Sequence, residues 1–101
     1  MVKFGLKQRH IDAITGVFLK YPQVECALLF GSRAKGNFRA NSDIDLALKG
    51  AIDLTTLLKI ETSLDDLLLP YKIDLTNYHK IKNKDLIDHI DRVGVLFYEK
   101  I

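Results

Sequence analysis

Apolar residues recur with two different periods along the chain, and these periods predict a series of helices and strands. In residues 6–20 they fall at every third or fourth position, which is typical of one face of an amphipathic helix. Residues 43–48 and 72–76 instead alternate between apolar and polar side chains, as in strands with one face in a core. The run 24–30 is apolar almost throughout, which indicates a central strand covered on both faces.

Residues that start and stop helices set the limits of these elements. Pro22 and Pro70 end the preceding helices, Asp53 and Asn83 are good N-caps, and Gly94 closes the last helix. The predicted order is helix 6–20, strand 24–30, helical turn 32–36, loop 37–42, strand 43–48, helix 53–69, strand 72–76, helix 84–92 and edge strand 95–98. The apolar side of helix 53–69 is expected to hold Leu57, Leu58, Leu64 and Leu68.

This order predicts an α/β (α+β) fold with a small mixed sheet and flanking helices. A chain of 101 residues can bury one core, so we expect a single domain, 1–101. The net charge of +2 does not predict strong nucleic-acid binding. The one cysteine, Cys26, excludes an internal disulfide and is expected to be a buried structural thiol. The sequence lacks a signal peptide and any apolar run near the roughly 20 residues of a membrane helix, so a cytoplasmic location is expected.

Two alternating strands carry carboxylates on one face. Asp43 and Asp45 are separated by one residue, so their Cα atoms lie about 6.5–7 Å apart on the same side of a strand. Both can reach a pair of hard cations, and magnesium prefers such oxygen ligands. Asp74 has the same outward position on strand 72–76, and it joins them if the two strands pair. The mutual repulsion of three carboxylates favours a bound cation.

A Gly-Ser turn follows the buried strand 24–30. Gly31 lets the backbone approach a ligand, while the Ser32 hydroxyl and the following N–H groups can hold phosphate oxygens. Arg33 is the nearest cation; Lys35 and Arg39 are further candidates, although surface solubility explains these two equally well. Taken alone, an Asp-x-Asp strand or a Gly-Ser turn is usually an ordinary surface feature, but the combination is far more specific.

The combined pattern resembles a known family. Gly31-Ser32-Arg33-Ala34-x-Gly36, then Ser42-Asp43-Ile44-Asp45-Leu46, then a later strand with Asp74, is similar to the nucleotidyltransferase superfamily of DNA polymerase β type. Within that superfamily it resembles the small stand-alone minimal nucleotidyltransferases (MNT). The resemblance covers essentially the whole chain.

The resemblance implies transfer of a nucleoside monophosphate from a nucleoside triphosphate to an acceptor hydroxyl, with release of pyrophosphate. By position, Asp43 and Asp45 would hold two Mg²⁺ ions, and Asp74 would help hold the catalytic ion and orient or deprotonate the acceptor. Gly31 and Ser32 would anchor the β- and γ-phosphates. The implied nucleotide-binding set also includes Arg33 and Ser42.

The resemblance also implies a partner. MNT proteins of this length are often encoded beside a HEPN-domain protein and form a complex with it. In several pairs the HEPN protein is an RNase toxin and the MNT protein is the antitoxin, which can act by attaching AMP from ATP to a tyrosine of the toxin. Two alternatives stay open: a non-catalytic nucleotide-binding antitoxin that acts by complex formation, and nucleotidyl transfer to a small molecule. A homo- or hetero-oligomer is compatible with each.

The three histidines do not fall at metal-ligand spacing. His10, His79 and His89 are therefore expected to be surface or helix-face residues. The basic stretch 79–84 is expected to be a solvated loop.

Overall fold

The chain folds into two short strands followed by an alternation of helices and strands. The structure is a computed structural model that describes residues 2–100. Its elements are β1 (Val2–Lys3), β2 (Leu6–Lys7), α1 (Gln8–Leu19), β3 (Cys26–Phe30), α2 (Ser32–Lys35), β4 (Ile44–Lys49), α3 (Leu54–Asp65), β5 (Ile73–Asn77), the 3₁₀ turn η1 (Tyr78–Lys80), α4 (Lys84–Val93) and β6 (Val95–Glu99). No helix of this described part is long and apolar enough to cross a membrane.

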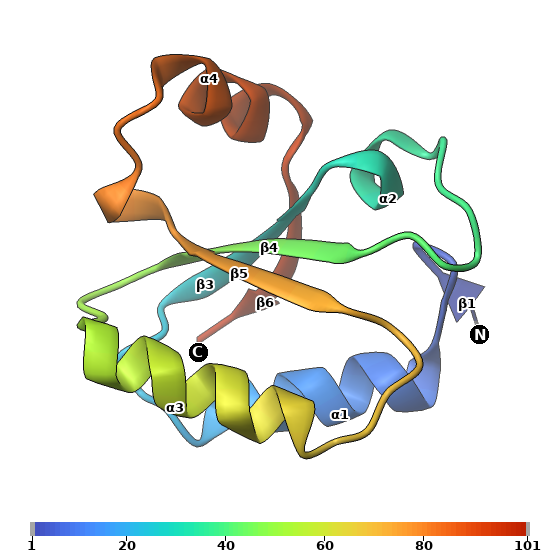
Figure 1. Cartoon of the computed structure of the whole chain (residues 1–101), viewed down its shortest axis with the longest axis horizontal. Coiled ribbons are helices and arrows are strands. Elements are labelled where there is room, and N and C mark those ends of the chain that lie inside the picture. Colours follow the sequence, from blue (N-terminus) through green and yellow to red (C-terminus); the bar gives the residue numbers. More distant parts are fainter. Residues whose placement is uncertain (1, 101) are drawn as a thin grey trace.

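The central sheet is mixed, as predicted. Its strand order is β5-β4-β3-β6, with β3 antiparallel to β4 and β6, and β4 parallel to β5. Helices α1 and α3 lie on one side of the sheet, and α2 and α4 lie on the other (Figure 1). The fold class predicted from the sequence is confirmed.

Apolar side chains fill both sides of the sheet. The larger cluster packs the sheet against α1 and α3 and is centred on Phe18, Leu46 and Ile60. A smaller cluster lies beneath α4 and contains Phe30, Ala47 and Ile90. Ala47 does point away from the larger core, as its alternation predicts, but it is fully buried in the smaller cluster beside Ile90 of α4. The second face of β4 is therefore polar at one end and buried at the other.

Helix α3 is shorter than predicted. It ends at Asp65 instead of residue 69, and the chain leaves it through Leu68, which has a positive φ of 54°. Leu68 is 88% exposed and Leu58 is 51% exposed, so placing them on the buried side was wrong. Leu57 packs against the core, whereas Leu58, which is about 100° further round the helix, lies at the solvent-exposed side.

An N-terminal hairpin replaces the start of the first predicted helix. β1 and β2 pair in antiparallel fashion across Phe4 and Gly5, which have φ values of 59° and 73°. Two consecutive positive φ values are typical of a type I′ turn, the tight connection that suits twisted strands. Such short strands show no alternation, so the pattern of apolar residues did not reveal them. Helix α1 consequently begins at Gln8.

Enlarging Ala47 should weaken the contact between α4 and the sheet. Ala47→Leu adds three carbon atoms to a site with no exposed surface, and overpacking of this kind costs about 1–3 kcal/mol. The free energy of unfolding in urea should fall by that amount. Ala51→Leu makes the same change at an exposed turn and should leave stability within about 0.5 kcal/mol of wild type. Equal stability of the two variants would contradict the observed position of α4.

Candidate functional site

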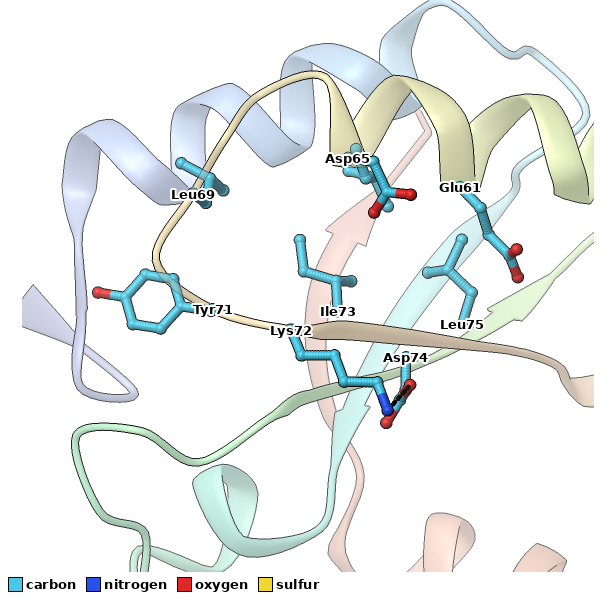
Figure 2. Close-up of a pocket in the computed structure, with 9 residues that line it drawn as sticks. Glu61, Asp65, Leu69, Tyr71, Lys72, Ile73, Asp74 and Leu75 are labelled. Atoms are coloured by element: carbon cyan, nitrogen blue, oxygen red, sulfur yellow. Dashed lines mark ion pairs between the residues drawn. The ribbon is translucent and has the colours of Figure 1, made fainter.

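The parallel pairing of β4 with β5 brings two of the predicted carboxylates together. Asp45 and Asp74 are register partners on these adjacent strands, whose axes are about 4.8 Å apart. The Ile44 amide donates to the Lys72 carbonyl at 2.8 Å and aligns the start of the pair. Asp74 lies on the opposite side of β5 from Ile73 and Leu75, which point toward α3 (Figure 2). The predicted pairing of the strands that carry Asp45 and Asp74 is therefore present. Asp43 was expected within the strand, but it lies just before β4 and is exposed.

The carboxylate patch is short of positive charge. Burial raises the pKa of the Asp45 carboxyl, and the charges of Asp74 and Asp43 raise it further. The charges of His89 and Lys72 act in the opposite direction. Lys72 lies 3.7 Å from Asp74, as measured from Nζ to Oδ1, and Figure 2 marks this pair. The Lys72 ammonium thus supplies one positive charge beside Asp74. A divalent metal ion would neutralise the carboxylates more strongly than this single charge does.

The residues at this patch fit a hard divalent cation. Carboxylate oxygens are the ligands magnesium prefers, and it fills the rest of its shell with water and phosphate. A Cβ built on Gly31 would collide with the Asp45 carboxylate, so the Gly-Ser turn and Asp45 are in direct contact. Within residues 2–100, no three His, Cys, Asp or Glu side chains form a ready-made metal cluster. Magnesium that is bound to a phosphate needs only one or two protein carboxylates, and Asp45 and Asp74 can supply these.

The Gly-Ser turn connects β3 to the single turn of α2. Gly31 has φ 74° and ψ −154°, a conformation that side chains disfavour, and α2 begins directly after it. The helix ends at Lys35, and the following Gly36, which has a left-handed backbone, donates its N–H to the Ser32 carbonyl at 2.9 Å. The first N–H groups of a helix have no carbonyl partner within it. The turn therefore presents donors next to Asp45.

The Arg33 side chain serves the loop instead of facing the carboxylates. It is 2% exposed, and its guanidinium donates to three backbone carbonyls: Phe4 at 2.9 Å, Ala40 at 3.2 Å and Ser42 at 2.9 and 3.1 Å. These bonds tie the hairpin and the loop 37–42 to α2. The expectation that this side chain binds phosphate does not fit its position. Its donors are already used by carbonyl oxygens.

Aromatic rings complete the surroundings of Arg33. Its guanidinium carbon lies 5.2 Å from the centre of the Phe38 ring and 5.1 Å from that of Tyr71, within cation–π range. Ser42 belongs to the same loop, and its hydroxyl accepts a hydrogen bond from the Arg39 amide at 2.8 Å. The segment that leads into Asp43 is thereby held in one conformation.

Other predicted residues lie outside this cluster or differ in burial. Lys35 and Arg39 are exposed, and Cys26 is half-buried. His10 is largely buried beside Tyr71, with a ring-centroid distance of 5.4 Å, whereas a surface position was one of the expectations. Sequence reasoning missed His89, whose charge acts on Asp45. No spacing relates a histidine on α4 to a carboxylate on β4, so no sequence signal pointed to it.

The mixed sheet, the Gly-Ser turn and the adjacent carboxylates Asp45 and Asp74 define a domain that can hold a phosphate group beside a divalent cation. Residues 12–101 match the family described as "Polymerase beta, Nucleotidyltransferase". The chain belongs to this family of nucleotidyltransferases, whose members generally use divalent metals.

Several solved structures share the fold. A toxin-antitoxin crystal structure with AMP-PNP has a TM-score of 0.72 and 22% identity, over 89% of this chain and 73% of that one. A toxin-antitoxin MntA-HepT structure has a TM-score of 0.68 and 21% identity, over 93% and 74% of the two chains. A tri-AMPylated Shewanella oneidensis HEPN toxin in complex with MNT antitoxin has a TM-score of 0.67 and 20% identity, over 92% and 72%. Comparison with curated protein sequences gave no match. At these identities the structures establish the fold alone.

Removing the Arg33 guanidinium should destabilise the protein strongly. Arg33→Met keeps most of the side-chain volume but leaves three carbonyls without their donor, and each orphaned acceptor costs about 1–3 kcal/mol. Because such costs are not additive, we expect a loss of about 3 kcal/mol in urea unfolding. Arg33→Lys should recover little, because one ammonium group cannot reach three carbonyls as the planar fork does. The exposed Arg39→Met should change stability by less than about 0.5 kcal/mol; an equally large loss there would contradict the special role of Arg33.

Asp45→Asn should stabilise the metal-free protein. The folded-state pKa of Asp45 is raised, so its contribution to stability is present below the unfolded-state pKa and is lost as the pH rises through the folded-state pKa. At neutral pH the variant removes that penalty, and we expect a higher melting temperature. Raising the pH from about 3.5 to 7 should lower the stability of wild type relative to the variant. Asp66→Asn, on an exposed aspartate, is the matched control; a lower melting temperature for Asp45→Asn alone would refute this prediction.

Proposed function

We propose that this protein is a magnesium-dependent nucleotidyltransferase that moves AMP from ATP to a hydroxyl group on a partner protein. The observation that carries the proposal is the register of β4 and β5, which aligns Asp45 with Asp74 beside the Gly31 turn. Membership of the nucleotidyltransferase family supports the reaction class. The adenine nucleotide is supported by two proteins of the same fold, one described with AMP-PNP and one with an AMPylated toxin.

In this proposal the donor nucleotide lies between the Gly-Ser turn and β4. The backbone at Gly31 and the Ser32 hydroxyl bind the β- and γ-phosphates, while Asp43 and Asp45 hold the magnesium ions. When bound, magnesium would neutralise charge on the triphosphate and on the departing pyrophosphate. Arg33 acts through the loop that it fixes, and Ser42 acts as a member of that loop. Positioning and charge neutralisation then supply most of the catalysis.

The acceptor hydroxyl approaches Asp74 in this scheme. The acceptor oxygen forms a bond to the α-phosphorus, and the bond from that phosphorus to the α–β bridging oxygen breaks. Asp74 orients the hydroxyl and accepts its proton, and pyrophosphate leaves with the bridging oxygen. The products are an AMP ester of the acceptor and pyrophosphate, so atoms and charge balance.

The position of β5 supports an acceptor from another molecule. β5 is an edge strand of the sheet, so Asp74 has a neighbouring strand on one side only. The side chain of Asp74 remains 45% exposed. The acceptor in this proposal is a tyrosine of a HEPN-domain protein, as the tri-AMPylated HEPN toxin with its MNT antitoxin suggests.

A label-transfer assay tests the proposal. The protein is incubated with Mg²⁺, α-³²P-labelled ATP and a candidate HEPN-domain partner protein, and we expect label on the HEPN protein. The double variant Asp43→Asn/Asp45→Asn should reduce transfer at least about 1000-fold, because the ions lose two proposed carboxylate ligands, one on β4 and one just before it. Chelation of Mg²⁺ with EDTA should also stop transfer.

A control variant and a contrary outcome complete the label-transfer assay. Asp66→Asn changes an exposed carboxylate at the end of α3 and should leave transfer unchanged. If wild type binds the nucleotide and neutralises the partner without moving label, the protein is a non-catalytic antitoxin. Competition with unlabelled GTP, CTP and UTP tests the assignment of ATP.

A further inference from the structure

Helix α4 lies over the face of the sheet that carries the carboxylates. Figure 1 shows α4 and α2 on this side of β4, opposite α1 and α3. Ile90 fixes α4 to the sheet through its burial against Phe30 and Ala47. The Tyr78 hydroxyl adds a hydrogen bond of 2.7 Å to Asp91 of the same helix. The side chains of α4 that face the sheet are therefore held in place above β3 and β4.

His89 lies on the side of α4 that packs against β3. Its ring meets the ring of Phe30 edge to face, with centroids 6.1 Å apart and an interplanar angle of 81°. Phe30 is the register partner of Asp45 and the last residue before the Gly31-Ser32 turn. Directly opposite residues of paired strands present their side chains on the same face. His89 consequently lies beside both the carboxylates and the turn.

The fold itself leaves the polar atoms of His89 unused. Its side chain is half-buried, and among residues 2–100 neither ring nitrogen has a hydrogen-bond partner. The charge of His89 acts on Asp45, which agrees with their proximity. His79 differs, because it is exposed and packs against Tyr78 on η1. Of these two histidines, His89 has a ring that faces the site with a free donor.

We propose that His89 binds the donor nucleotide, with an imidazole N–H that donates a hydrogen bond to a phosphate oxygen of the magnesium-bound triphosphate. This assignment rests on the proposed function. A phosphate oxygen is an anionic acceptor, and hydrogen bonds to charged groups are about twice as strong as neutral ones. A rigid donor on a packed helix also loses little entropy on binding. His89 thus supplies from α4 a hydrogen-bond donor for phosphate, in addition to the donors of the Gly-Ser turn at the end of β3.

Titration of the protein with Mg²⁺ and AMP-PNP tests this role. His89→Phe keeps an aromatic ring against Phe30 but removes the donor, and we expect the Kd to rise about 10- to 50-fold. His89→Gln restores an N–H donor and should bind within about threefold of wild type. His79→Phe is the matched control and should not change the Kd. Circular dichroism melting of each variant shows that the proteins compared are folded.

An observation on wild type avoids any effect of the variants on folding. In ¹⁵N-histidine NMR spectra, the ring resonances of His89 should shift when Mg²⁺ and AMP-PNP are added, whereas those of His79 should not. If wild type binds the nucleotide and His89→Phe binds equally well, this inference fails while the proposed function stands. If wild type does not bind the magnesium nucleotide at all, the proposed function fails together with this inference.

Discussion

The parallel pairing of β4 with β5 is the constraint on which the site depends. Parallel neighbours require a crossover connection, and α3 provides it while covering one face of the sheet. The opposite face can then keep the polar side chains of both strands. A slip of one residue in β5 would turn Asp74 toward α3 and expose Ile73, and the burial of apolar side chains opposes such a slip. The packing that stabilises the sheet therefore also aligns the carboxylates.

Two side chains near the site have opposite effects on the stability of the fold. Arg33 stabilises its loop, because its guanidinium joins α2, the N-terminal hairpin and the segment before Asp43 through backbone carbonyls. Asp45 has the opposite effect, because burial and neighbouring carboxylates disfavour its charge. A rigid loop beside carboxylates whose charge is disfavoured is suited to bind a metal-bound phosphate. The protein groups that would contact the phosphate and the metal are already in position before they bind. The absence of a side chain at Gly31 allows the turn to touch Asp45.

Much of the fold could be predicted because its signals are local. The periods of apolar residues gave the order of the helices and the central strands, and N-caps are short-range interactions. Asp53 accepts from the Thr56 amide, and Asn83 accepts from the amides of Asp85 and Leu86, as their positions predicted. The hairpin and the end of α3 were missed. Both depend on positive φ values that no run of apolar residues reveals.

The sequence by itself determined which residues could carry the chemistry: Gly31, Ser32 and the aspartates, spaced so that a strand would place the carboxylates on one face. Tertiary structure decided the roles of the side chains around these residues. Arg33 contacts Phe4, 29 positions away, and so binds the loop instead of being left for phosphate. His89 reaches the site because α4 packs across the sheet onto Phe30. Periodicity tells which face a side chain takes, but only the packing of distant segments fixes what lies on that face.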